Sequence, residues 1–259
     1  MGHFTVLVTR THLKSADEQL EPFYAQGNVD DYLMEHDIEV PAVDIESRAC
    51  QIVEKDITND DHLSAEYGKL LEAGDYGEIC QQWYGGQFDE HGNLYHLVNP
   101  NAKWDWYSVG GQWSGYFKLK EGARGTLGKP GAFGNERKYD ADVCKVTDID
   151  WQYMTDQKRQ EALRNWEVYK AKVAAGEQVE PYFDYDIEQD DTKESYVKRR
   201  TSNATFAVLH EGKWFQRDEM GWFGVVRTGE DADDWEKQFE ALIASLDLND
   251  EVTVVDCHI

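Results

Sequence analysis

The chain has 259 residues, of which 51 are acidic and 26 basic, so its formal net charge is −25. A chain this negative repels nucleic-acid phosphates, which argues against general DNA or RNA binding. The charge instead indicates a basic protein partner, bound cations or plain solubility. Apolar residues make up 41% and aromatic residues 13% of the chain. This composition predicts a packed core rather than general disorder.

The N-terminal end predicts a strand followed by a short helix. Residues 4–9 (FTVLVT) are rich in residues that favour strands. Ser15 is the expected helix N-cap, because Glu18 lies three residues later and completes a capping box. Pro22 falls beyond the first turn, so we expect a kink or an early end there. Gly27 closes the helical pattern.

The middle of the chain, residues 28–203, mixes helical segments with turn-rich ones. Helices are predicted between residues 44 and 84, and a long helix is predicted to end at Gly176. Residues 121–140 are rich in glycine and contain a proline, which predicts a mobile loop.

The C-terminal end nearly mirrors the first. Residues 204–216 predict two strands around a turn at Glu211 and Gly212. Residues 231–246 predict an amphipathic helix, and residues 251–259 (EVTVVDCHI) predict a buried strand. The apolar face of that helix is expected to consist of Trp235, Phe239, Leu242, Ile243 and Leu246.

Together the two ends have the element order β-α … β-β-α-β, which is that of a ferredoxin-like split βαβ unit. The predicted fold class is therefore α+β. Residues 1–27 and 204–259 would form the ferredoxin-like core, with the first strand near the last one. Residues 28–203 would form a large inserted lobe of mixed helical and β-rich structure, or one continuous domain with the core.

Cysteine spacing and the lack of long apolar runs indicate in which cellular compartment the protein is expected. The four cysteines include no CxxC pair, which argues against a zinc knuckle, and free thiols suit a reducing cytoplasm. The N-terminus has no secretory pattern, and no apolar run is long enough to cross a membrane. A cytoplasmic protein without membrane association is expected, and the oligomeric state stays open.

Residues 103–117 (KWDWYSVGGQWSGYF) combine three tryptophans, two tyrosines and three glycines. One interpretation is structural, with the aromatic rings pinning a loop-rich lobe and the glycines forming turns or bulges. The other is a binding site in which backbone N–H groups approach a ligand and aromatic faces stack on it. Lys103 would then meet an anion, and Asp105 would orient polar groups.

Residues 83–93 and 219–224 repeat this combination of glycines and aromatics, which favours a shared pocket. None of the three segments has the spacing of a phosphate loop or a dinucleotide fold. The predicted ligand-binding residues are Lys103, Trp104, Asp105, Trp106, Tyr107, Gly110, Gly111, Gln112, Trp113, Glu219 and Trp222.

Five longer motifs carry a family resemblance: GGQFDEHGN, NPNAKWDWYSVGGQWSG, DIDW, DEMGWFG and VTVVDCHI. With them the chain resembles an uncharacterised family of proteins encoded by phages, prophages and some bacteria, from Gly85 to its end and more loosely before. That family has no settled activity and transfers no catalytic residues. Its pattern has Arg where this chain has Gln112, which lacks the cationic fork of an arginine. The resemblance implies a virus–host setting.

Metal chemistry is the main catalytic alternative. The candidate ligands are His96, Asp105, Asp256 and His258, and the last two share one face of the predicted final strand. Such a site would hold a divalent metal that hydrolyses a phosphodiester. No HExxH or comparable framework accompanies these residues, and Ser108 and Ser114 do not lie in a nucleophile elbow.

These observations favour a binding protein without catalysis and without a cofactor. It would counter host defence by sequestering a nucleotide-like small molecule or by occupying a host protein. A metal-dependent hydrolase of a nucleotide signal is the first alternative, and an acidic inhibitor that mimics DNA is the second. A purely structural phage component is a further possibility.

Overall fold

The computed structural model describes residues 2–10, 14–25, 35–56, 61–131, 138–217 and 232–259. The chain divides into two compact units. The main unit consists of Met1–Glu21 and Trp104–Ile259, and the second unit is Pro22–Lys103. Both units contain helices and strands, so the predicted α+β class is confirmed.

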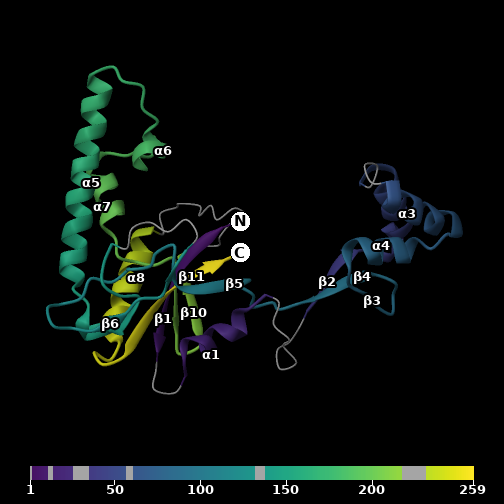
Figure 1. Ribbon diagram of the computed structural model, residues 1–259, viewed down its shortest axis with the longest axis horizontal. Helices are drawn as coiled ribbons and strands as arrows, with labels where there is room; N and C mark the ends of the chain where they lie inside the picture. Colours follow the sequence, from purple (N-terminus) through teal and green to yellow (C-terminus); the bar gives the residue numbers. More distant parts are fainter. Residues whose placement is uncertain (1, 11–13, 26–34, 57–60, 132–137, 218–231) are drawn as a thin grey trace. The chain divides into compact units, whose positions relative to one another are not determined.

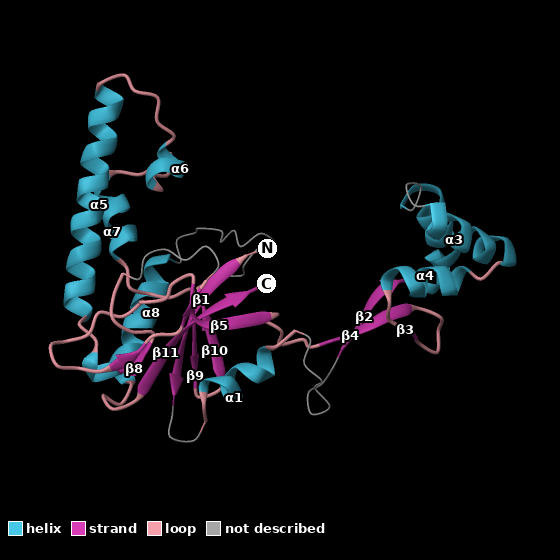
Figure 2. Ribbon diagram, viewed as in Figure 1, coloured by secondary structure: helices cyan, strands magenta, loops and turns pink. Residues whose placement is uncertain are grey.

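The main unit is built on a mixed sheet, which has eight strands in the described part of the chain. Its central strand β1 (His3–Arg10) is antiparallel to β11 (Glu251–His258) and parallel to β9 (Ala207–His210). The sheet has the order β10-β9-β1-β11-β5-β7, while β8 pairs with both β11 and β6 (Figures 1 and 2). The other strands are β5 (Trp106–Gly111), β6 (Gly125–Thr126), β7 (Lys129–Pro130), β8 (Val143–Lys145) and β10 (Lys213–Gln216).

The expected pairing of the first strand with the last one is confirmed, with His3 opposite His258 and Arg10 opposite Glu251. The β9–β10 hairpin also turns where predicted, at Glu211 and Gly212, which both have positive φ. The ferredoxin-like detail is not confirmed. A split unit leaves a strand between the two parallel strands, whereas β1 pairs directly with β9.

The division into units differs from the expected insertion over residues 28–203. Residues 104–203 cluster with the chain ends, because β5 and β8 both pair with β11. The second unit is therefore limited to residues 22–103. The loop expected at 121–140 is also partly ordered into β6 and β7, so that prediction is wrong for these residues.

Three helices of the main unit were predicted, α1 (Ala16–Leu20), α5 (Trp151–Ala174) and α8 (Ala232–Ser245), whereas α6 (Pro181–Tyr185) and α7 (Lys193–Thr201) were not. Ser15 and Glu18 form the predicted capping box of α1, which a 3₁₀ turn at Glu21–Phe23 ends early, as Pro22 led us to expect. A further 3₁₀ turn lies at Val146–Asp148.

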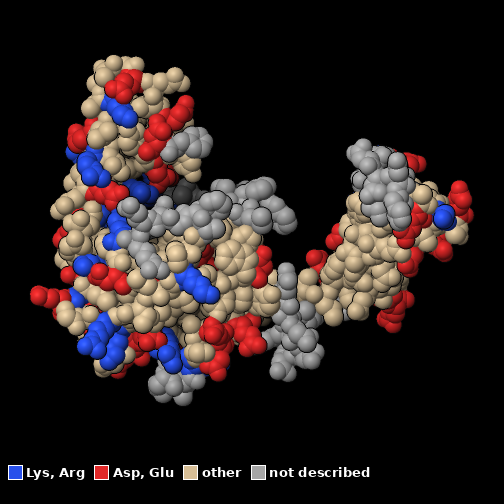
Figure 3. All heavy atoms as spheres, viewed as in Figure 1, with Lys and Arg blue, Asp and Glu red and all other residues tan. Residues whose placement is uncertain are grey.

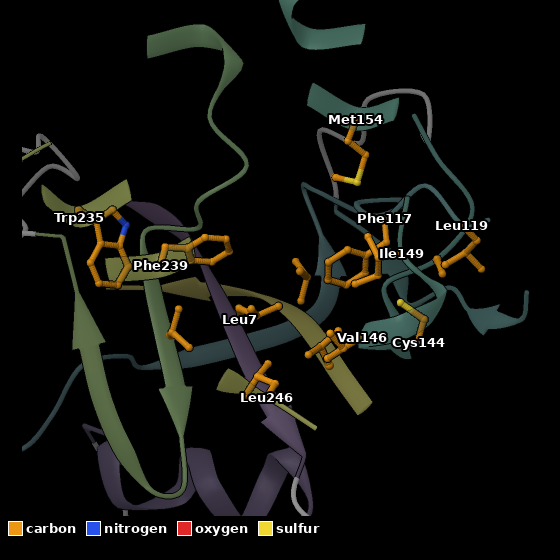
Figure 4. Close-up of a cluster of buried hydrophobic side chains, with 14 residues drawn as sticks. Leu7, Phe117, Leu119, Cys144, Val146, Ile149, Met154, Trp235, Phe239 and Leu246 are labelled. Carbon is orange, nitrogen blue, oxygen red and sulfur yellow. The ribbon is translucent and has the colours of Figure 1, made fainter. Parts of the chain in front are cut away.

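One core of the main unit lies on one face of the β1–β11 pair, against α8 and against the segments that carry Phe117, Ile149 and Met154 (Figure 4). Trp235 and Phe239 of α8 are buried there as predicted, and Leu7 of β1 meets them from the sheet. The indole N–H of Trp235 donates to the Thr205 carbonyl over 2.9 Å. A smaller core joins α5 and α7 through Ala162, Trp166, Ile187 and Tyr196.

The face of β1 and β11 that packs on α8 changes character along its length. Alternate residues of a strand share a face, and so do residues directly opposite in an antiparallel pair. Leu7 and its partner Val254 are therefore on the same face as Thr5 and Asp256, and as His3 and His258. This face is apolar beneath α8 and becomes polar toward the C-terminal end of β11.

The second unit has a small antiparallel sheet and helices of its own (Figure 1). The sheet has the order β2-β4-β3. Its core includes Val40, Ile52, Ile79 and Leu94. The elements are β2 (Glu35–Val40), β3 (Gln87–Phe88), β4 (Leu94–Val98), α2 (Ile45–Gln51), α3 (Asp61–Ala73) and α4 (Tyr76–Tyr84), with a 3₁₀ turn at Ala42–Asp44 and a π turn at Ile52–Asp56.

None of the helices in the described part of the chain combines the length and the apolar character that a membrane crossing requires.

Candidate functional site

The turn that follows β5 is held by the carboxylate of Asp142, which is fully buried. This carboxylate accepts hydrogen bonds from Ser114 Oγ (2.9 Å), Gly115 N (2.6 Å) and Tyr116 N (3.0 Å). It also accepts one from Gly128 N over 2.8 Å. A single side chain thus fixes the aromatic-glycine turn and the neighbouring glycine-rich segment together.

Gly110 and Gly111 let the chain pass close to two carboxylates. Both have positive φ, 77° and 52°. A Cβ at Gly110 would overlap the side chain of Asp142, and one at Gly111 would overlap that of Asp256. The close approach that we expected toward a ligand is therefore made toward the protein's own buried side chains.

The turn forms one wall of a pocket of about 450 Å³ in the main unit. Trp113 and Tyr116 contribute aromatic surface, and Gln112 and Gly115 lie between them. Thr5, on the polar part of the β1 face, also lines the pocket. The volume lies within the range that small-molecule sites occupy.

The pocket lining contains cationic side chains and the carboxylate of Glu161, although the chain as a whole is acidic. The cations are Lys138, Lys158, Arg199 and Arg200. Lys and Arg side chains lie among Asp and Glu side chains over α5 and α7 (Figure 3). Several of these cations already have partners, since Lys138 pairs with Glu161 over 2.7 Å and both arginines pair with carboxylates.

Lys158 differs from these cations, because within the described residues its ammonium group has no ion pair. Its Nζ donates to the Ser202 carbonyl over 2.7 Å and lies 5.9 Å from the centre of the Tyr116 ring. Burial, and then the nearby charges of Lys138 and Arg200, lower the pKa of Lys158 to about 8. An anion placed here would find a desolvated cation with no direct ion pair, although the carboxylates of Glu161 and Glu236 act on it from a distance.

This pKa predicts a specific dependence of stability on pH. Between about pH 8 and the ordinary lysine value of 10.5, the unfolded chain keeps a proton on Lys158 that the folded protein has released. The unfolded state then binds more protons, so this group makes the free energy of unfolding rise with pH. Lys158→Met removes this contribution.

Urea unfolding of both proteins at pH 7.5 and 9.5 measures the effect. Because other groups titrate in the same window, the prediction concerns the difference between the two proteins. The wild type should gain stability relative to Lys158→Met as the pH rises. A difference that stays constant would contradict the lowered pKa.

Two buried polar atoms belong to residues that line the same pocket. In the described part of the chain, neither Tyr139 Oη nor Arg199 Nε has a hydrogen-bond partner. Buried polar groups are almost always satisfied in folded proteins, if not by the chain then by water or a ligand. Both atoms are buried beneath the accessible surface, so a ligand in the open pocket does not contact them directly.

A second cluster lies at the polar end of the β1–β11 pair. His3 Nδ1 lies 2.9 Å from Asp256 Oδ1, and His258 Nδ1 lies 2.7 Å from Asp105 Oδ1. The two imidazole rings are 5.1 Å apart edge to face, and Trp106 stacks on His258 at 5.2 Å. Asp256 is buried and also accepts a hydrogen bond from Gln112 N over 2.9 Å.

The structure separates the predicted ligand-binding residues into three groups. Gln112 and Trp113 line the pocket, while Asp105 and Trp106 belong to the histidine cluster. Trp104 is buried, and its indole N–H donates to the Leu20 carbonyl. Tyr107 Oη donates to Asp17, and burial together with that carboxylate raises the pKa of Tyr107. These last two residues have structural contacts instead of open stacking faces.

The remaining candidates lie elsewhere. Lys103 ends the second unit, and its N–H donates to the Phe23 carbonyl. His96 is on β4 of the second unit, so it is not grouped with Asp256 and His258. Glu219 and Trp222 lie outside the described residues.

Of the four metal candidates His96, Asp105, Asp256 and His258, Asp105 binds His258, while Asp256 binds His3. A metal ion held by the protein alone typically needs three or more ligating side chains that converge on one point. In the part of the chain that the structure describes, no three His, Cys, Asp or Glu side chains are arranged to hold a metal ion.

Comparison of the chain with family models, curated proteins and solved structures found no match. The site is therefore interpreted from its own geometry.

Sequence reasoning missed His3, Asp142 and Lys158. His3 has no motif around it, and it comes close to Asp256 only because β1 pairs with β11. Asp142 and Lys158 resemble the many other charged residues of this chain. The run Lys198–Arg199–Arg200 was the one available signal, because a basic cluster stands out in so acidic a sequence.

Proposed function

We propose that this chain is a phage-encoded accessory protein that counters host defence by binding a nucleotide-like small molecule in the pocket beside α5 and α7. The observation that supports the proposal most is the combination of aromatic and cationic side chains in one pocket of a strongly acidic protein. The virus–host setting rests on the family resemblance described above, which the motifs WDWYSVGGQWSG, DEMGWFG and VTVVDCHI carry.

The pocket chemistry suits a nucleotide in two ways. The Trp113 ring offers a surface for a base, and base–aromatic stacking contributes about 1–3 kcal/mol per base. Tyr116 supports this wall, since its hydroxyl donates to the Asn203 carbonyl and its ring packs edge to face on Phe117. Lys158 supplies a largely buried cation for a phosphate, and its Nζ already donates to the Ser202 carbonyl beside the pocket. A general nucleic acid is disfavoured, since the net charge of −25 repels a long chain of phosphates.

The alternative of an acidic DNA mimic requires carboxylates in a stripe with phosphate-like spacing. On the face of the main unit that Figure 3 shows, Lys and Arg side chains interrupt the acidic ones over α5 and α7. This mixture favours the ligand proposal over the mimic.

The test is a binding screen. The purified protein is mixed with nucleoside mono-, di- and triphosphates and cyclic nucleotides, and the protein-free filtrate is assayed by liquid chromatography. We expect at least one nucleotide to be depleted. For that ligand, Lys158→Met should raise the Kd about 10- to 100-fold, because a hydrogen bond to a charged group contributes about 1.5–3 kcal/mol.

Lys145→Met is the matched control, because Lys145 is an exposed lysine of β8 outside the pocket. It should leave the Kd unchanged. If no nucleotide of the panel is depleted, the ligand proposal is wrong, and occupation of a host protein becomes the function to test. An equal loss of affinity in both lysine variants would show that general charge, and not this pocket, binds the ligand.

A further inference from the structure

The histidine cluster has the arrangement of an acid–base pair. In both histidines the Nδ1 atom is bound to a carboxylate, Asp256 for His3 and Asp105 for His258. A carboxylate at Nδ1 fixes the tautomer and the ring orientation, and it directs the other nitrogen outward for proton transfer. Within the described residues, neither Nε2 atom is in a hydrogen bond.

The two histidines are also accessible to different degrees. The His3 side chain is 25% exposed and that of His258 is 8% exposed. Trp106, which stacks on His258, is 43% exposed and leaves part of its indole open. The cluster therefore combines two oriented imidazoles with an available aromatic surface.

The cluster adjoins the nucleotide pocket through two connections. His3 and Thr5 are on the same face of β1, about 7 Å apart by the rise of a strand, and Thr5 lines the pocket. Gln112 lines the pocket too, and its backbone N–H donates to Asp256, the partner of His3. Neither histidine lines the pocket itself, so the proposal requires the substrate to extend beyond Thr5 to reach the two imidazoles.

We propose that His3 and His258 cleave 3′,5′-linked ribonucleotides whose base is bound in the adjacent pocket. This inference rests on the proposed function, since it assigns a substrate class and a reaction to the same binding site. His3 and His258 are the catalytic groups, while Asp105 and Asp256 position them.

The reaction is an internal transesterification. One imidazole, in its neutral form, accepts the proton of the ribose 2′-hydroxyl through Nε2 as O2′ attacks phosphorus. The other, in its protonated form, donates a proton to O5′ as the P–O5′ bond breaks. The O2′–P bond forms, and the products are a 2′,3′-cyclic phosphate and a free 5′-hydroxyl. Protons and electrons balance within the substrate and the two histidines.

The test uses a diribonucleoside monophosphate, adenylyl-(3′→5′)-adenosine, and its 2′-deoxy counterpart. The deoxy compound retains the bases and the phosphate but lacks the attacking hydroxyl. We expect both compounds to bind and only the ribonucleotide to be cleaved. Liquid chromatography should show adenosine 2′,3′-cyclic phosphate and adenosine as the products.

His3→Ala and His258→Ala should each lower the cleavage rate about 100-fold or more, which is the range of general acid–base catalysis. Both variants should bind the deoxy compound with a Kd close to that of the wild type. His91→Ala, at an exposed histidine of the second unit, should cleave normally. If an alanine variant fails to fold by circular dichroism, His3→Asn or His258→Asn replaces it.

The outcomes separate the two proposals. Binding of both compounds without cleavage overturns the catalytic inference and leaves the binding function standing. Absence of binding of either compound also overturns the catalytic inference, whereas the proposed function is overturned only if the nucleotide panel is not depleted either. Cleavage of the deoxy compound, or normal cleavage by both histidine variants, shows that the mechanism is wrong.

Discussion

Asp142→Ala is expected to unfold the main unit or to lower its free energy of unfolding by about 4 kcal/mol or more. The substitution removes the acceptor for the N–H groups of Gly115, Tyr116 and Gly128 and for the Ser114 hydroxyl. An unsatisfied buried donor costs about 1–3 kcal/mol, and several lose their acceptor together. A typical domain is stable by about 5–15 kcal/mol, so a loss of this size is severe.

Asp140→Ala is the matched control, because its carboxylate lies two residues away and is 43% exposed. It contacts Lys118 Nζ and Leu119 N, and water can replace those contacts. Urea unfolding followed by tryptophan fluorescence compares the two variants with the wild type. Asp142→Ala should unfold at a much lower urea concentration than the wild type. Asp140→Ala should lower the free energy of unfolding by only about 1 kcal/mol. Equal losses would mean that Asp142 does not organise the turn.

Gly110→Ala is expected to be the second most damaging substitution. The added Cβ would overlap the Asp142 carboxylate at a position where φ is 77°. Two costs then add, the penalty of a side chain in left-handed backbone and the displacement of a carboxylate that binds four donors. We expect a loss of about 3 kcal/mol or more.

Gly122→Ala separates the two costs. Gly122 has nearly the same φ, 79°, but no atom lies within 4 Å of the position of its Cβ. Gly122→Ala should lower the free energy of unfolding only by the cost of a side chain in left-handed backbone, about 1–2 kcal/mol. Thermal unfolding of both variants measures the difference, which reports the crowding against Asp142. Similar melting temperatures would show that backbone conformation alone explains both glycines.

The elements at the two chain ends were predictable because local signals determine them. The capping box of Ser15 and Glu18, the glycine turn of the β9–β10 hairpin and the apolar face of α8 each depend on residues within a few positions. The order of the strands in the sheet was not predictable from such local signals. β1 pairs in parallel with β9, about 200 residues later, and no periodic pattern in the sequence specifies that pairing.

The aromatic-glycine segment shows where sequence reasoning about the site succeeded and where it failed. One of its two interpretations, glycines at turn or bulge positions, agrees with the positive φ of Gly110, Gly111 and Gly115, and Gln112 and Trp113 line a pocket. The pattern did not distinguish the buried Trp104 from the exposed Trp106, two positions away. Both are tryptophans in the same motif, and their burial depends on what packs against each of them.

The sequence by itself determined the α+β class, the strongly patterned elements of the chain ends and the unusual chemistry of residues 103–117. Tertiary structure decided which charged residues matter. His3 meets Asp256, Asp142 binds the turn after β5, and Lys158 approaches Tyr116 across long intervals of sequence. The physical reason is that burial and strand pairing select a few side chains from many alike, and in a chain with 77 charged residues their identity alone does not single them out.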